Sequence, residues 1–144
     1  MRDRRVWLSG LAAGLLIDVL DSAINGGVFG AASQAAYDRL RVTPPEGLLI
    51  VHWLAYGLVV GLAIAWITAL SVRSGSSGGA GVKAAIVVWA IAHGPIFAEA
   101  IAGIMPGSLV LATGALELAT WAAAGWLATW IQSRSTAAAR LPAT

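Results

Sequence analysis

Four long apolar stretches, separated by short polar connectors, constrain this chain more than any other feature of its sequence. They cover residues 6–29, 48–70, 84–105 and 109–131. A helix needs about 20 mostly apolar residues to cross the bilayer's hydrocarbon core, and it satisfies its own backbone hydrogen bonds there. Charged residues make up only 11% of the 144, against about a quarter in soluble domains. The sequence therefore predicts an all-α integral membrane protein, a single four-helix transmembrane bundle over residues 1–131.

Basic residues are distributed unevenly among the segments outside these spans. Arg39 and Arg41 lie between the first and second spans, whereas the other seven fall in the N-terminal segment, the middle connector and the C-terminal tail. Because cytoplasmic loops carry an excess of Lys and Arg, we expect both termini to be cytoplasmic. The basic N-terminus also resembles a signal peptide, but Asp18 and Asp21 interrupt its apolar run, so we expect no cleavage.

The connectors carry local signals of their own. Residues 30–42 form either a short helix in the interface or a solvated loop. Residues 43–46 match a capping box at the start of the second helix. Met-Pro-Gly-Ser at 105–108 predicts a tight turn that makes the third and fourth helices antiparallel neighbours. We expect the tail, residues 132–144, to be disordered.

Polar and ionisable side chains inside the predicted spans are the residues that bear on function. Such groups are costly in hydrocarbon, so they face the bundle interior and mark functional sites. They form the predicted intramembrane site, which consists of Asp18, Asp21, Asn25, His52, Tyr56, His93, Glu99 and Glu117. The i, i+3, i+7 spacing of the first three puts them on one face of the first helix.

Some of these polar residues are expected to lie at the same depth in the membrane. Counting about 1.5 Å per residue from each span's midpoint predicts one layer that contains Asp21, Tyr56, Glu99 and Glu117. Carboxylates that share a level of low dielectric cannot all stay charged without a cation or a strong donor. We therefore expect at least one of them to carry or share a proton.

Proline and glycine patterns predict where helices bend and touch. Pro95, two residues after His93, predicts a kink that re-aims Glu99. Two Gly-x-x-x-Gly patterns, at 10–14 and 57–61, predict close helix contacts, either within the bundle or in a dimer.

These residues leave two functional classes open. One is a site for a proton, a cation or a small ligand, with transport as its wider role. The other is a non-catalytic accessory or structural membrane subunit, whose buried polar network only stabilises the bundle or a partner contact. The only partner that the composition requires is the lipid bilayer; a homo-oligomer and a partner subunit both remain open.

Several enzyme classes lack support in this sequence. There is no cysteine, no Glu-x-x-His pair of the di-iron type, and no hydrolase, metalloprotease or nucleotide-binding motif. The sequence therefore identifies no catalytic residue, cofactor or particular metal. The basic residues form no long patch, so nucleic-acid binding is not expected.

Two segments carry a resemblance to known proteins: SGLAAGLLIDVLDSAINGGVFG (9–30) and VVWAIAHGPIFAEAIAGIMPGSLVLATGALELATWAAAGWLATWI (87–131). They resemble a group of small, uncharacterised bacterial inner-membrane proteins with four helices. The resemblance covers about half the chain, and it implies a four-helix fold in the bacterial cytoplasmic membrane but no activity. The plan is also similar to that of small multidrug-resistance transporters, but the residues around the first-helix acid differ, so no role is carried over.

Overall fold

The computed structural model describes residues 2–43, 47–75 and 79–138. These residues contain helices and no strand, so the all-α prediction is confirmed for them. In chain order, the elements are α1 (Arg2–Ser22), the π-helix η1 (Ala23–Val28), α2 (Gly30–Leu40), α3 (Leu48–Arg73), α4 (Ala80–Ile101) and α5 (Gly107–Ala138).

Four helical segments are long and apolar enough to cross a membrane. They cover Arg4–Val28, Ile50–Arg73, Ala80–Ile101 and Gly107–Arg134. Each overlaps one predicted span, and α1 continues into η1 to form the first. For residues 30–42 the sequence allowed either a short helix or a loop. The structure shows the helix α2 over residues 30–40.

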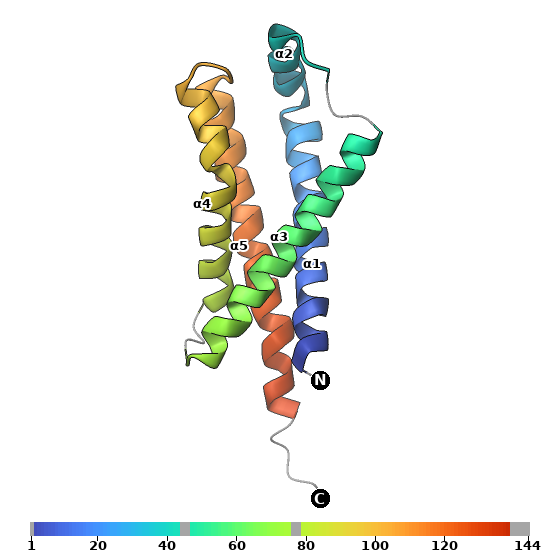
Figure 1. Ribbon diagram of the computed structural model, residues 1–144, viewed down its shortest axis with the longest axis vertical. Coiled ribbons are helices and arrows are strands. Elements are labelled where there is room, and N and C mark those ends of the chain that lie inside the picture. Colours follow the sequence, from blue (N-terminus) through green and yellow to red (C-terminus); the bar gives the residue numbers. More distant parts are fainter. Residues whose placement is uncertain (1, 44–46, 76–78, 139–144) are drawn as a thin grey trace, which may run out of the picture.

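The long helices pack side by side around a core of small side chains. α1 packs against α3 and α5, and α4 forms an antiparallel hairpin with α5. Figure 1 shows α3 running obliquely across α1 and α5, with the described part of the chain beginning and ending at the same end of the molecule. Six of the ten residues in the buried core cluster are alanine, and small residues let helix backbones approach closely.

Glycines make the closest of these contacts. A Cβ at Gly61 would overlap the backbone of Gly10 and Gly14, so both glycine patterns pack α1 against α3 within the chain. A second contact, which the patterns did not predict, joins α4 to α5. There, a Cβ on either Gly81 or Gly125 would overlap the other residue's carbonyl oxygen.

The turn between α4 and α5 lies earlier than the Pro-Gly signal predicted. α4 ends at Ile101 rather than at 105, because Gly103 adopts a positive φ of 72°. The N–H of Ile104 donates to the carbonyl of Glu99 (2.9 Å), and the N–H of Gly103 donates to that of Ala100 (3.1 Å). These two bonds form a Schellman motif, which satisfies the last carbonyls of α4. The turn therefore occupies residues 102–106, and α5 begins at Gly107.

Two further boundaries differ from the sequence prediction. Gly47, not Thr43, precedes the first turn of α3; the rest of the predicted capping box, residues 44–46, lies outside the described residues. The predicted disordered tail is helical up to Ala138, and residues 139–144 lie outside the described residues. Its first residue, Gln132, donates to Ser9 Oγ (2.9 Å) and to the Ala65 carbonyl (3.1 Å). Contacts to α1 and α3 thus extend the helix beyond the apolar stretch.

Candidate functional site

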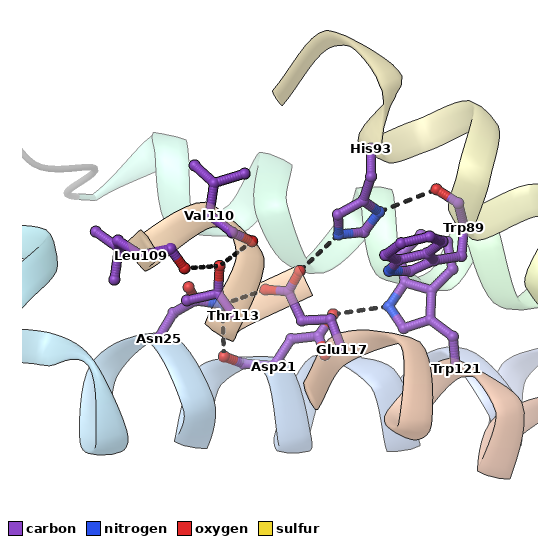
Figure 2. A network of polar contacts seen from close by, with 9 residues as sticks. All are labelled: Asp21, Asn25, Trp89, His93, Leu109, Val110, Thr113, Glu117 and Trp121. Carbon is purple, nitrogen blue, oxygen red and sulfur yellow. Dashed lines mark hydrogen bonds and ion pairs between the residues drawn. The ribbon is translucent and has the colours of Figure 1, made fainter. Parts of the chain in front are cut away.

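The centre of the candidate site is a buried contact between α4 and α5. His93 Nε2 lies 2.6 Å from Glu117 Oε2, and both side chains are almost fully buried. The other ring nitrogen, Nδ1, lies 3.0 Å from the carbonyl oxygen of Trp89, one turn earlier in α4. Figure 2 shows the imidazole held between these two oxygens.

Asn25 joins this pair to the first span. Its Nδ2 donates to Glu117 Oε1 (2.7 Å) and to the main-chain carbonyl of Asp21 (3.0 Å). Asn25 lies in the π-helix η1, where Phe29 N–H reaches back five residues to the Ile24 carbonyl (2.9 Å). The Asn25 side chain competes with backbone donors for the Asp21 carbonyl, which gives a physical reason for the wider helix here. π-Helical turns of this kind are frequent at functional sites.

Asp21 reaches α5 through an indole. Trp121 Nε1 donates to Asp21 Oδ2 (3.0 Å), and the other carboxylate oxygen, Oδ1, is buried and has no hydrogen-bond partner in the described part of the chain. The Trp121 ring also meets His93 edge-on, with ring centroids 5.3 Å apart, while Trp89 stacks on the imidazole at 4.7 Å. Two indole rings thus flank the imidazole of His93.

Asp18 lies one turn along α1 from Asp21 but faces a different helix. A Cβ at Gly57 of α3 would overlap the Asp18 carboxylate, so this acid sits against the α3 backbone. Asp18 is only 4% exposed, and among the residues that the structure describes neither of its carboxylate oxygens has a hydrogen-bond partner. A carboxylate buried in this way needs a proton or a cation to offset its lost hydration.

Three predicted site residues stand apart from this cluster. His52 and Glu99 are exposed at the protein surface, and Tyr56 is 50% exposed. His52 Nδ1 is bonded within its own helix, to the Leu48 carbonyl at 2.7 Å. The structure therefore brings four of the eight into one hydrogen-bond network, namely Asp21, Asn25, His93 and Glu117. A fifth, Asp18, is buried one turn away on α1, against α3.

The early turn explains why Glu99 is not level with Glu117. Glu99 is two residues from the end of α4, whereas Glu117 is ten residues into α5. The difference of eight residues corresponds to about 12 Å along the helices. His93, eight residues before the end of α4, takes the position opposite Glu117. The single predicted layer is therefore wrong for Glu99, because the turn uses residues that were assigned to the helix.

Sequence reasoning missed the two tryptophans of the site. Trp89 precedes His93 by four residues and Trp121 follows Glu117 by four, so each shares a helix face with the residue that it accompanies. That spacing was available as a signal. The other five tryptophans are 39% to 63% exposed, as expected for indoles near membrane interfaces.

The partners of His93 determine where its protons lie. The Trp89 carbonyl can only accept a hydrogen bond, so Nδ1 carries a hydrogen. The short contact from Nε2 to Glu117 Oε2 then holds one more proton. That proton belongs either to an imidazolium beside a carboxylate or to a carboxylic acid beside a neutral imidazole. Without that proton, the Glu117 carboxylate would face the lone pair on His93 Nε2, and the two would repel each other.

The arrangement of the side chains supports a metal site less than it supports a hydrogen-bond network. Among the described residues, no three His, Asp or Glu side chains group closely enough to hold one. The site is instead an interhelical hydrogen-bond network with a short contact between His93 and Glu117 at its centre. No protein-family model, curated protein or solved structure matches this chain.

Proposed function

We propose that this chain is a small multi-pass protein of the bacterial inner membrane, with four spans and both termini in the cytoplasm. Its intramembrane polar site binds a proton, a cation or a small ligand, and the geometry favours the proton. The observation that carries this proposal is the 2.6 Å contact between His93 Nε2 and Glu117 Oε2. Transport across the membrane is the wider activity that such a site supports.

The surroundings of the pair favour exchange of a proton over a purely fixed network. The unpartnered oxygens of Asp18 and Asp21 lie on the same helix as Asn25, which bonds Glu117. These carboxylate oxygens can accept a proton or a hydrogen bond, and the buried region around them contains few hydrogen-bond donors. Among the described residues, these carboxylate oxygens have no hydrogen-bond donor of their own, so they are available to accept a proton from the pair.

The second candidate function is an accessory or structural subunit. It is favoured by the fact that the hydrogen bonds of Asn25, Glu117 and His93 tie the first span, α5 and α4 together. Under this alternative, the network fixes how the helices are rotated against each other, and no proton needs to leave it.

Infrared difference spectroscopy across a pH range, on protein reconstituted in vesicles, tests the proposal. The signal is the C=O stretch of a protonated carboxyl group, compared among the wild type, Glu117→Gln and Glu99→Gln. Glu99 is the matched control because it is an intramembrane glutamate that is exposed and outside the network. Thermal unfolding in mild detergent is measured for the same three proteins.

The proposal expects a pH-dependent carboxyl or imidazole signal that Glu117→Gln removes and Glu99→Gln retains. An unaltered spectrum in Glu117→Gln, with only its unfolding temperature lowered, would favour the structural subunit. Elemental analysis of the purified protein covers the cation form of the site. A stoichiometric metal that is lost in Glu117→Gln would replace the proton as the ligand.

A further inference from the structure

A groove opens between the beginning of α1 and the last turns of α3, away from the polar site. Its volume is about 460 Å³. Its lining comes from the adjacent Val6 and Trp7 of α1 and from Leu62, Trp66, Ala69, Leu70 and Arg73 of α3. Its walls are apolar along most of their length, and its one charged lining residue, Arg73, is the last residue of α3.

The length of the groove matches one leaflet of a bilayer. From Leu62 to Arg73 the helix advances eleven residues, or about 16 Å at 1.5 Å per residue. Half of the hydrocarbon core is about 15 Å thick. A single acyl chain lying along the groove would therefore run from the middle of the membrane to its surface, with its head beside Arg73.

Charge at the surface end of the groove selects the kind of head group. Arg73 forms no ion pair with any carboxylate whose side chain the structure describes. Arg4, one turn before Trp7 on α1, is exposed and adds positive charge at the same end. A guanidinium matches the geometry of phosphate oxygens and binds them in pairs. Trp7, one turn after Arg4, is 55% exposed, and an indole at this end of the groove sits at the level of the head groups.

We propose that this groove binds one acyl chain of an anionic phospholipid, with the head-group phosphate at Arg73. The inference rests on the chain lying in a membrane but not on the proton site, which other residues form. A lipid bound in this groove differs from the lipid that surrounds any membrane protein, because it occupies one defined binding site. Its head group contacts one basic residue, and the site prefers a negatively charged head group.

Native mass spectrometry of the full chain in a neutral detergent tests this site. The protein is titrated separately with phosphatidylglycerol and with phosphatidylcholine of identical acyl chains, and binding of the first lipid is quantified. We expect the wild type to bind phosphatidylglycerol about fivefold more tightly for each basic contact to the head group. Arg73→Gln is expected to lose about fivefold of that preference.

Two further variants distinguish binding in the groove from nonspecific electrostatic attraction of lipid to the protein surface. Lys83→Gln removes an equal charge from α4 at a residue outside the groove lining, and it should leave the first binding event unchanged. Ala69→Phe fills the groove wall and should weaken the first binding of both lipids. The proposal would be overturned if Arg73→Gln and Lys83→Gln lost equal affinity for the first phosphatidylglycerol. It would also be overturned if Ala69→Phe bound the first lipid normally. Either result would mean that the protein binds annular lipid only.

Discussion

The carboxylate of Asp18 occupies the space that a side chain at position 57 would fill, so an acid in α1 and a glycine in α3 depend on each other. The acid is buried, and within residues 2–43, 47–75 and 79–138 its two carboxylate oxygens have no hydrogen-bond partner. Its position is therefore set by packing against the α3 backbone rather than by a donor. Gly57 also belongs to one of the two glycine patterns that join α1 to α3.

Gly57→Ala should destabilise the fold by forcing the Asp18 carboxylate out of this space. Overpacking of this kind costs about 1 to 3 kcal/mol. The measurement is the free energy of unfolding in mixed detergent micelles, followed by circular dichroism. Asp18→Ala in the same chain makes room for the new methyl group, so the double variant should lose less than the sum of the two single variants.

A matched glycine shows whether the effect is local. Gly107 begins α5, and a Cβ there meets no atom within 4 Å. Gly107→Ala should therefore change the free energy of unfolding by no more than about 0.5 kcal/mol. Equal losses at positions 57 and 107, or strict additivity with Asp18→Ala, would contradict the dependence of Asp18 on Gly57.

Trp121→Phe should destabilise the protein by about 1 to 3 kcal/mol, because it leaves Asp21 Oδ2 buried without its donor. The phenyl ring retains most of the packing on His93, so the loss reports the hydrogen bond more than the contact area. Trp126 is the control: it lies in the same helix and is 61% exposed. Trp126→Phe should stay within about 0.5 kcal/mol of the wild type, and similar losses in both would point to ring size instead.

Asn25→Ala removes the donor that links the first span to Glu117, together with its bond to the Asp21 carbonyl. We expect a loss of about 1 to 3 kcal/mol in the free energy of unfolding, since buried oxygens lose their partner. Gln34 offers a comparison, because its amide donates to Asp38 at the exposed surface (2.9 Å). Gln34→Ala should have little effect, and no difference between the two variants would mean that Asn25 does not support the network.

The proposed topology can be mapped with single cysteines, because the chain has none of its own. Ser74→Cys, just after α3, should react with an impermeant thiol reagent only after cells are permeabilised. Met105→Cys, in the turn between α4 and α5, should react in intact cells. Labelling of the cysteine at position 74 in intact cells would reverse the orientation inferred from the basic residues.

Elements that depend on local composition were predicted well from the sequence. Each span follows from the length of an apolar run, since hydrocarbon forces such a run to be helical whatever its neighbours are. The polar residues of the site were also within reach, because a polar group in an apolar run is visible without knowing what it touches. The two tryptophans of the site could also have been found, because each lies four residues from a polar site residue in the same span.

Which of these polar groups meet was decided only by the tertiary structure. The Schellman motif at Gly103 shortens α4 by four residues relative to the prediction and brings His93, not Glu99, opposite Glu117. The close contacts of Gly57 with Asp18 and of Gly81 with Gly125 set how the helices are rotated and spaced. By itself, then, the sequence determined that the chain forms apolar helices with costly polar groups inside them. The pairing of those groups depends on helix ends and rotations, where a shift of one residue turns a side chain by about 100° to another neighbour.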